Sequence, residues 1–434
     1  MRNIKFLSKT HIKKKYYELL AFLKFYNLIC NIFIKNLSFS SSSRKYNALC
    51  IGRSIFNEDI NSLSENSKSI NFYIIDKSFF LLFFFYFLRD MPSHQIHIHY
   101  HQYTQFNKSK KNYYNFLDNL FNKIFKKINF HILISANYNY AWQQELAKMA
   151  LKRKIPFVVL LKEFISPIND IDQNIERYTN NFFIGSKLLV YNDNIKKSFL
   201  KKKINGIEEN KIISVGIPRF DKYQNIKQDK PENNLLFFSF DINDKTRHLK
   251  LSNKDKKIIF SQAYNFHMEI FKFVKENKNF NVTIKTKSNS RYLKQVLEYA
   301  RETDTASCNN LNITNSKNIY ELIQNSSIVI CFNSTTIFEG LLSKRVILTP
   351  DIGRGIINNL SDGFHSSANL VKDSNDIKKI INNFDQSKLE FSDNAKILLK
   401  NYIHFFDYSS SSFTNKILTK EIEKKFSNTY EYIN

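Results

Sequence analysis

The stretch at residues 326–350, SSIVICFNSTTIFEGLLSKRVILTP, constrains the fold of this chain more than any other. Its apolar, β-branched run at 328–332 is typical of a strand that is buried on both faces of a parallel sheet. Polar residues follow, and apolar residues then recur at helical spacing up to residue 342. A further apolar run at 346–348 ends near Pro350. The pattern predicts strand, turn, helix and strand, which is the repeating unit of an α/β fold.

The start of that helix has the composition of an anion site. Hydroxyls and free backbone N–H groups at a helix N-terminus suit a phosphate, and the hydroxyls here belong to Ser334, Thr335 and Thr336. Glu339 lies one turn further on, where its carboxylate could reach a ribose. The alternative is a capping box, because Thr336 and Glu339 have the Thr-x-x-Glu spacing that caps helices without any ligand. These residues alone leave both interpretations open.

The rest of the chain predicts two domains of the same kind. A chain of 434 residues, 43% hydrophobic, is long enough for two or three domains with cores. Strands alternate with helices on both sides of the polar, proline-containing segment 225–234. We expect two doubly wound, Rossmann-like domains at 45–224 and 235–408, joined by that linker. Residues 1–44 form a basic N-terminal segment with a serine-rich linker, and 409–434 form a C-terminal helix.

Apolar runs give the expected strands. In the first domain they lie at 46–51, 71–75, 129–136, 155–161, 188–191 and just before Gly216. In the second domain they lie at 235–240, 281–285, 311–313, 328–332 and 346–348. The run FFLLFFFYFL at 79–88 is too short to span a membrane and is expected to be a buried helix.

The N-terminal segment combines positive charge with an apolar run. Residues 1–15 carry six Lys or Arg, and 16–37 are mostly apolar. On a single helix, Lys24, Asn27, Asn31 and Lys35 would form one narrow polar stripe. This pattern predicts an interfacial helix on an anionic membrane surface, so the protein is expected to be cytoplasmic and peripheral at the inner face of the membrane. A helix packed on the protein itself and a secretory signal are the alternatives. No uninterrupted apolar stretch is long enough to span a bilayer.

Several other classes of protein are disfavoured by composition. The four cysteines form no C-x-x-C pair, which argues against a disulfide framework or zinc ribbon and suits a reducing compartment. No G-x-G-x-x-G and no Walker A sequence occurs among the eight glycines. The net charge of +26 comes from scattered lysines without an RRM, KH or zinc-finger pattern, so we expect no nucleic-acid partner.

Two patterns resemble metal sites but do not predict one. His97, His99 and His101 alternate, and on a strand they would share one face. Same-face positions on one strand splay apart, however, and no carboxylate is near in sequence. Asp170 and Asp172 form a D-x-D pair, which is common in loops. We therefore expect no metal.

Lys162 and Glu163 follow the strand at 155–161. Ligands of open α/β sheets bind at the carboxyl ends of strands, so Glu163 is a candidate general base. A salt bridge or an ordinary loop charge is the alternative interpretation.

Four segments together resemble a known group of enzymes. They are FVVLLKE at 157–163, VGIPRFDKY at 215–223, LLFFSF at 235–240 and FNSTTIFEGLLSKRVI at 332–347. Their order and spacing are similar to those of the GT-B-fold bacterial glycosyltransferases of surface and capsule polysaccharide biosynthesis, which are related to the CDP-glycerol glycerophosphotransferases. The resemblance covers residues 130–350.

The resemblance implies a nucleotide-activated donor, a nucleotide sugar or CDP-glycerol, bound in a cleft between the domains. It implies a polysaccharide or lipid-linked acceptor and neither a cofactor nor a metal. The residues implied on the donor side are Ser239, Lys285, Ser334, Thr335, Thr336 and Glu339. Of these, the hydroxyls at 334–336 would hold the phosphates, Glu339 the ribose, and Lys285 would lie near the phosphates.

On the acceptor side the resemblance implies Glu163 as the base or acceptor-orienting residue, with Lys162 and Arg219 as phosphate or interdomain contacts. Relatives often have Lys-x-His-Pro where this chain has Lys285-Thr286-Lys287, so no histidine role is implied there. A nucleotide-sugar epimerase of the same fold and a non-enzymatic membrane-surface scaffold are the alternative functions.

Overall fold

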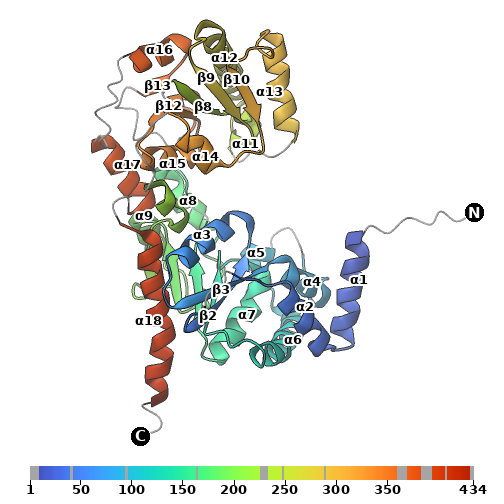
Figure 1. Ribbon diagram of the computed structural model, residues 1–434. Helices are drawn as coiled ribbons and strands as arrows, with labels where there is room; N and C mark the ends of the chain where they lie inside the picture. The colour runs from blue at the N-terminus through green and yellow to red at the C-terminus, as the bar shows by residue number, and fades with distance from the viewer. Residues whose placement is uncertain are drawn as a thin grey trace, which may run out of the picture. The chain divides into compact units, whose positions relative to one another are not determined.

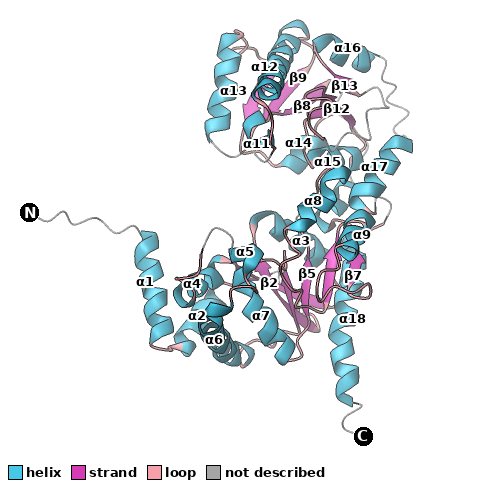
Figure 2. Ribbon diagram, turned by 180° about the vertical axis from the view of Figure 1, so that it is seen from behind, coloured by secondary structure: helices cyan, strands magenta, loops and turns pink. Residues whose placement is uncertain are grey.

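The computed structural model describes residues 9–39, 43–92, 96–162, 165–224, 233–246, 249–287, 290–358, 369–382, 393–405 and 408–430. The chain forms two compact units (Figure 1). The first comprises Met1–Phe164, Ile171–Arg219 and Tyr408–Asn434, and the second comprises Ile165–Asp170 and Phe220–Asp407. Each unit is an α/β layer structure with its own sheet, and helices flank the strands in both (Figure 2).

The first unit contains a seven-stranded sheet in the order β1-β3-β2-β4-β5-β6-β7. Its strands are β1 (Ser38–Phe39), β2 (Tyr46–Gly52), β3 (Ile70–Asp76), β4 (Ile132–Ser135), β5 (Phe157–Leu160), β6 (Lys187–Val190) and β7 (Ile212–Ser214). All neighbouring strands are parallel except β1, which pairs antiparallel with β3. The predicted strands of this domain are therefore confirmed, and the short β1 is an addition at the sheet edge.

The second unit contains a six-stranded, fully parallel sheet in the order β10-β9-β8-β11-β12-β13. Its strands are β8 (Asn234–Phe238), β9 (Asn281–Lys285), β10 (Leu311–Thr314), β11 (Ile328–Cys331), β12 (Val346–Pro350) and β13 (Leu370–Val371). Strands β11 and β12 are buried throughout, as their continuous apolar runs predicted. The predicted strand, turn, helix and strand at 326–350 is thus confirmed.

Helices cover both sheets. Those of the first unit are α1 (Lys9–Phe22), α2 (Tyr26–Lys35), α3 (Ser54–Glu65), α4 (Ser78–Phe87), α5 (Ile96–His99), α6 (Asn107–Phe125), α7 (Ala141–Lys152), α8 (Ile171–Glu176), α9 (Asp193–Lys201) and α18 (Ser410–Tyr430). Those of the second are α10 (Asp221–Gln224), α11 (Ile242–Thr246), α12 (Asn253–Glu276), α13 (Ser290–Glu302), α14 (Ile319–Gln324), α15 (Thr336–Leu342), α16 (Ser374–Asn382) and α17 (Asp393–Ile403).

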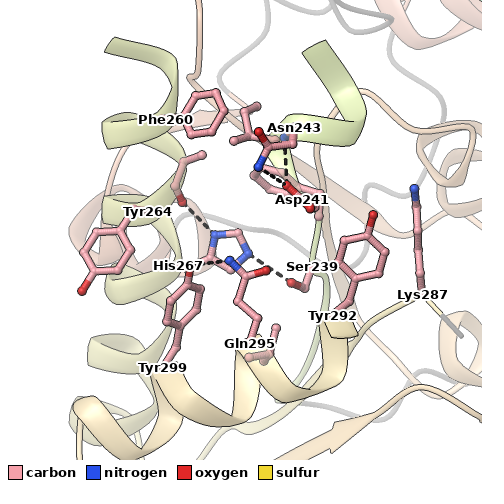
Figure 3. A pocket seen from close by; sticks show the side chains of 14 residues that line it. Ser239, Asp241, Asn243, Phe260, Tyr264, His267, Lys287, Tyr292, Gln295 and Tyr299 are labelled. Atoms are coloured by element: carbon pink, nitrogen blue, oxygen red, sulfur yellow. Dashed lines mark hydrogen bonds between the residues drawn. The ribbon is translucent and has the colours of Figure 1, made fainter. Parts of the chain in front are cut away.

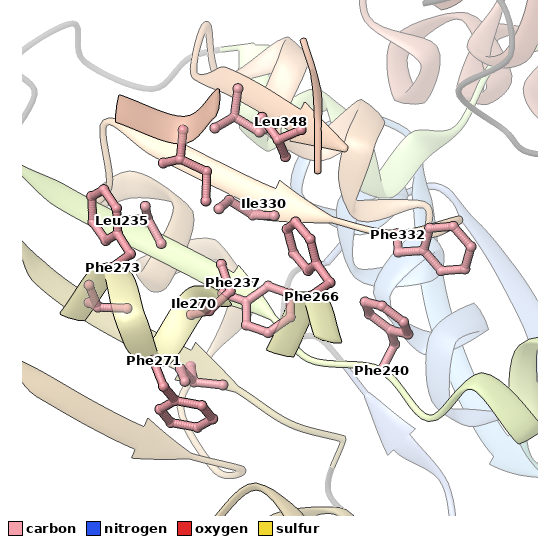
Figure 4. Packing of buried hydrophobic residues seen from close by; sticks show 14 of the residues in the cluster. Leu235, Phe237, Phe240, Phe266, Ile270, Phe271, Phe273, Ile330, Phe332 and Leu348 are labelled. Atoms are coloured by element: carbon pink, nitrogen blue, oxygen red, sulfur yellow. The ribbon is translucent and has the colours of Figure 1, made fainter. Parts of the chain in front are cut away.

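Aromatic and aliphatic side chains fill the core of the second unit (Figure 4). Phe237 of β8 and Ile330 of β11 are fully buried, and Phe266 of α12 packs against Phe237 with ring centroids 5.9 Å apart. Phe240 and Phe332, which follow β8 and β11, also pack together at 4.8 Å. The two strand ends that carry candidate site residues are therefore held close to each other by apolar packing.

The N-terminal segment differs from the single amphipathic helix that its sequence predicts. The chain forms two helices, α1 and α2, and Lys24 between them has a left-handed backbone with φ of 55°. On α2, Ile29, Cys30 and Phe33 are buried. The ring of Phe33 lies 5.2 Å from that of Phe79 on α4. The alternative of a helix packed on the protein itself therefore holds for α2, because the aromatic face of α4 offers it an apolar partner.

Helix α4 is buried as predicted, through Phe79, Phe80, Phe83 and Phe84. The histidine segment does not form the strand on which its alternating positions would share a face, because Ile96–His99 is the short helix α5. His97 accepts a hydrogen bond from the Ala141 N–H at 3.0 Å. The His101 Nε2 atom lies 3.1 Å from the Gln144 Oε1 atom, and burial lowers the pKa of His101 to about 4. No group of side chains suited to a metal ion occurs in the described part of the chain.

The C-terminal helix α18 belongs to the first unit, where it packs on α3 (Figure 1). Its Leu418 and Ile422 are fully buried in that unit's core. Asn415 donates a hydrogen bond to the Leu63 carbonyl at 2.9 Å, and the Ser411 hydroxyl lies 2.8 Å from that of Ser62. Helix α18 therefore contributes Leu418 and Ile422 to the core of the first unit.

Candidate functional site

The carboxyl edge of the second sheet gathers the predicted donor residues. Phe238 at the end of β8 lies opposite Lys285 of β9 on one side and Cys331 of β11 on the other. The Ser239 N–H donates to the Lys285 carbonyl at 3.0 Å. The residues that follow these three strands are consequently neighbours, which is the place where open α/β sheets bind ligands.

Lys285 carries a largely buried ammonium group at this edge. The residue is 8% exposed, and its Nζ donates to the carbonyls of Thr286 at 2.7 Å and Asn315 at 3.0 Å. Burial lowers the pKa of this ammonium. No acidic side chain of the described residues forms an ion pair with it. An anionic group would therefore find here a cation that the protein has not neutralised.

The turn before α15 uses its own backbone donors. Asn333 has a φ of 43°. The N–H groups of Ile337 and Phe338 donate to the carbonyls of Ser334 and Thr335 at 3.1 and 3.0 Å, and that of Thr336 reaches the Ser334 hydroxyl at 3.4 Å. The predicted free N–H groups are therefore occupied at these three residues, because the chain enters α15 through a tight turn. With seven residues, α15 is also a short helix.

The capping box is not formed. Thr335 precedes the helix with α-helical backbone angles and makes no side-chain cap, and Thr336 is the first helical residue. The Thr336 hydroxyl is buried and has no hydrogen-bond partner. Buried polar atoms are normally hydrogen bonded, so this unpaired hydroxyl at the start of α15 is an exception among the described residues near the strand ends. The Thr-x-x-Glu capping box, the alternative interpretation of these residues, is therefore not formed by Thr336 and Glu339.

Glu339 is held by a residue that the sequence did not single out. Its Oε2 accepts a hydrogen bond from the Tyr223 hydroxyl at 2.8 Å, and both residues are buried. The Tyr223 ring lies 5.5 Å from that of Tyr320, and the Lys222 ammonium lies over both rings. Tyr223 is the last residue of the segment VGIPRFDKY. Its place in this segment, which carries part of the family resemblance, is the sequence feature that could have pointed to it as a site residue.

Ser239 lies in a cavity of about 300 Å³ beside α12 and α13 (Figure 3). Aromatic and polar side chains share its walls. They are Ser239, Phe240, Asp241, Ile242, Asn243, Phe260, Ala263, Tyr264, His267, Lys287, Tyr292, Gln295, Val296 and Tyr299. A cavity that combines ring faces with convergent polar groups suits a small polar molecule. Of the residues that line this cavity, the sequence analysis assigned a role in ligand binding to Ser239 alone.

Ser239 and His267 form an oriented pair in this cavity (Figure 3). The His267 Nδ1 lies 2.7 Å from the Ala263 carbonyl, so this nitrogen carries the hydrogen. Burial lowers the pKa of His267 to about 4, which leaves the ring neutral at pH 7. The Nε2 atom, 3.1 Å from the Ser239 hydroxyl, then accepts the serine hydrogen. Ser239 consequently presents lone pairs to a ligand and would bind a hydrogen-bond donor in preference to a phosphate.

Arg219 is buried in the first unit. Its guanidinium pairs with Asp59 at 3.0 Å and donates to the Tyr191 hydroxyl at 3.0 Å. The Tyr191 hydroxyl in turn donates to the Lys162 carbonyl at 2.6 Å. Burial raises the pKa of the Asp59 carboxyl, and the guanidinium opposes this by favouring the charged form. Arg219 thus links α3 to β6 inside the first unit, and its proposed contact with a phosphate remains a prediction.

Glu163, the predicted general base, lies outside the described residues. Lys162 before it is half-buried.

The two aspartates of the D-x-D pair, Asp170 and Asp172, have separate protein partners. Asp170 accepts from Asn358 at 2.8 Å, and Asp172 pairs with Lys201 at 2.5 Å.

Comparisons with known proteins give a fold and no sequence family. No family model and no curated protein matches the chain. The UDP-N-acetylglucosamine 2-epimerase from Methanocaldococcus jannaschii has a similar structure, with a TM-score of 0.50 and 16% identity over 87% of this chain and 99% of that one. The chain has the two-domain, Rossmann-like GT-B fold. The fold implied by the sequence resemblance is therefore confirmed.

Two further solved structures are similar at lower scores. A glycosyltransferase from Rickettsia africae has a TM-score of 0.46 and 16% identity over 88% of this chain and 100% of that one. The UDP-N-acetylglucosamine 2-epimerase from Neisseria meningitidis, solved with UDP-N-acetylglucosamine, has 0.47 and 11% over 88% and 100%.

None of the described helices combines the length and the apolar character that crossing a membrane requires.

Proposed function

We propose that this protein is a glycosyltransferase that moves a sugar or glycerol phosphate from a nucleotide-activated donor to a surface polysaccharide or lipid-linked acceptor. The observation that carries the proposal is the pairing of Glu339 with Tyr223 beside the unpartnered Thr336 hydroxyl, at the carboxyl edge of the second sheet. A buried hydroxyl without a partner, such as that of Thr336, is costly unless a ligand bonds to it.

Glu339 is proposed to bind the ribose of the donor. A carboxylate has two oxygens with several lone pairs, so it accepts from two hydroxyls of a diol even when a third group is already bound. The bond from Tyr223 to Oε2 fixes the rotation of the carboxylate. A side chain held in this way binds a ribose without first losing its own conformational freedom.

Lys285 and Thr336 are proposed to bind the donor phosphates. When the bond from the transferred group to the nucleotide phosphate breaks, negative charge develops on the leaving phosphate. An ammonium in a partly desolvated setting stabilises that charge, and the Thr336 hydroxyl donates one more hydrogen bond. The proposal assigns this role to the chain's own cation and therefore requires no metal ion.

Glu163 is proposed to accept the proton of the acceptor hydroxyl while the new bond to the transferred group forms. This assignment rests on the sequence resemblance. Lys162 and Arg219 are proposed as phosphate contacts, and the network from Asp59 to the Lys162 carbonyl would keep the end of β5 rigid.

Calorimetric titration tests the donor site. The wild type, Glu339→Gln and Tyr223→Phe are titrated with CMP, CDP, UDP and GDP and with their sugar conjugates, and Glu298→Gln serves as a control because Glu298 is an exposed carboxylate of the same unit. We expect the wild type to bind the nucleotides of one base only. The affinity for these nucleotides should fall about tenfold or more in Glu339→Gln and stay unchanged in the Glu298→Gln control. Absence of any nucleotide binding would contradict the proposal and favour the non-enzymatic scaffold.

Product analysis then separates transfer from epimerisation. The preferred nucleotide sugar is incubated with and without a glycan acceptor, and both the nucleotide sugar and the acceptor are followed by mass spectrometry and NMR. Transfer releases free nucleotide only when acceptor is present. Interconversion of the nucleotide sugar without acceptor would show an epimerase, the other activity found among proteins of similar structure.

A further inference from the structure

We propose that the corner between α1 and α2 is a docking surface for an anionic lipid bilayer. The docking corner, as we name it, consists of large apolar side chains that point away from the protein body: Tyr16, Leu19, Phe22, Leu23, Phe25 and Leu28. This inference concerns the first unit and does not depend on the donor site.

Exposed apolar side chains are concentrated at this corner. Of the 17 large hydrophobic side chains that are exposed among the described residues, six lie within residues 16–28. Phe22 is 68% exposed, Leu19 52% and Phe25 50%. Single exposed apolar residues are normal on protein surfaces, whereas a contiguous group marks an interaction site.

The helices that carry the docking corner are anchored on the protein. On α1, Tyr17, Leu20 and Ala21 are buried, and the Tyr17 ring packs against Phe83 of α4 with centroids 5.6 Å apart. Leu19, Phe22 and Leu23 have the i, i+3, i+4 spacing of one helix face, and this face differs from the buried one. The buried face of α1 thus packs on the protein and holds the exposed side chains of the docking corner in place.

The corner geometry extends the apolar surface from one helix to the next. Lys24 adopts a φ of 55°, which ends α1 and lets Phe25 and then α2 follow at once. The four residues 22–25, Phe-Leu-Lys-Phe, are all exposed. Aromatic and leucine side chains beside a lysine are the composition of segments that lie at the boundary between headgroups and acyl chains.

Charge selects a bilayer as the occupant. Residues 1–37 carry eight Lys or Arg and a single acidic residue, Glu18. Glu18 already faces Lys14 at 3.9 Å and Lys15 at 3.1 Å. A second copy of the chain would bring cations against cations, which opposes self-association through this surface. Anionic headgroups complement the same charges, and adsorption needs no membrane-spanning helix.

Vesicle flotation with the full chain tests the inference. Vesicles of phosphatidylcholine alone are compared with vesicles that also contain phosphatidylglycerol, for the wild type, for Phe22→Ser/Leu23→Ser/Phe25→Ser and for Lys14→Gln/Lys15→Gln/Lys24→Gln. The control is Leu151→Ser/Phe182→Ser, which removes exposed apolar residues elsewhere in the first unit. We expect wild type and control to float with the anionic vesicles, and both corner variants to partition at least about tenfold less.

Three results would overturn the inference: wild type that stays unbound with anionic vesicles, corner variants that float like wild type, or a wild-type dimer in gel filtration that the serine variant converts to a monomer without lipid. Thermal unfolding checks that the variants are folded. Nucleotide binding, measured in the same variants without vesicles, should equal that of the wild type. Failure of membrane docking and failure of the proposed donor site are therefore distinguishable.

Discussion

The hydroxyl of Tyr223 donates a hydrogen bond of 2.8 Å to Oε2 of Glu339. Tyr223 comes from α10, directly after the chain enters the second unit, and Glu339 comes from α15, which follows the central strand β11. The bond therefore ties the beginning of this unit to the helix that carries the proposed donor residues. Because both residues are buried, the carboxylate has one defined orientation.

Tyr223→Phe should weaken nucleotide binding more than it weakens the fold. The variant keeps the ring that packs against Tyr320 and removes only the hydroxyl, so we expect a loss of about 1 kcal/mol in the free energy of unfolding. Without its donor, Glu339 loses orientation, and affinity for the preferred nucleotide should fall about fivefold. Urea unfolding and calorimetric titration measure the two effects. A stability loss with unchanged nucleotide affinity would assign the pair to the fold alone.

Thr336→Val should leave the fold as stable or make it more stable while it weakens nucleotide binding. The buried hydroxyl has no partner, so its replacement by a methyl group of similar shape removes a desolvation cost of about 1 kcal/mol. Nucleotide affinity should fall about tenfold, because the proposed phosphate contact is lost.

Thr246→Val is the matched control for that variant. Its buried hydroxyl donates to the Ile242 carbonyl at 2.8 Å, so the same substitution should destabilise the protein by about 1 kcal/mol and leave nucleotide affinity unchanged. If Thr336→Val proves as destabilising as Thr246→Val, the Thr336 hydroxyl has a partner within the protein and its assignment to a ligand fails.

His267 should make stability fall as the pH is lowered from 6.5 to 4. Its pKa is lowered by burial from 6.5 to about 4, so the unfolded state binds a proton in this window and the folded state does not. The stabilisation is complete above pH 6.5 and is lost as the pH falls to about 4, by on the order of 3 kcal/mol.

Urea unfolding at pH 5 and pH 7.5 measures that dependence. His101, whose pKa burial also lowers to about 4, contributes in the same direction, so the decisive comparison is wild type against His267→Gln. The variant should lose less stability between the two pH values than the wild type does. An equal loss in both proteins would mean that the imidazole is accessible to protons in the folded state.

Asp59 and Arg219 should behave as a coupled buried pair. Each single variant, Asp59→Asn or Arg219→Met, leaves the other group buried without its ionic partner, so we expect a loss of about 3 kcal/mol or more in the free energy of unfolding. The double variant should lose clearly less than the sum of the two. Additive losses in this double-mutant cycle would contradict a direct structural coupling.

Local sequence determined the strands of both sheets except the two-residue edge strands β1 and β13. Strands that are buried on both faces produce continuous apolar runs, and for this reason the segments 328–332 and 346–348 could be identified without knowledge of their neighbours in the sheet. The same local reasoning failed where one sequence pattern was compatible with two different backbone conformations. The alternation of the histidines at 97, 99 and 101 is compatible with a strand, yet Ile96–His99 forms a short helix. At Lys24 a single left-handed residue divides what periodicity presents as one helix.

Only the tertiary structure decided which side chains meet. The residues 334–336 and 339 were found from sequence because they share one turn, but the partner of Glu339 comes from a residue more than a hundred positions earlier. The pairing of Ser239 with His267, the burial of Arg219 against Asp59 and the return of α18 to the first unit have the same character. Periodicity reports the environment of each segment, whereas hydrogen-bond partners depend on how segments distant in the chain pack, which no local pattern encodes.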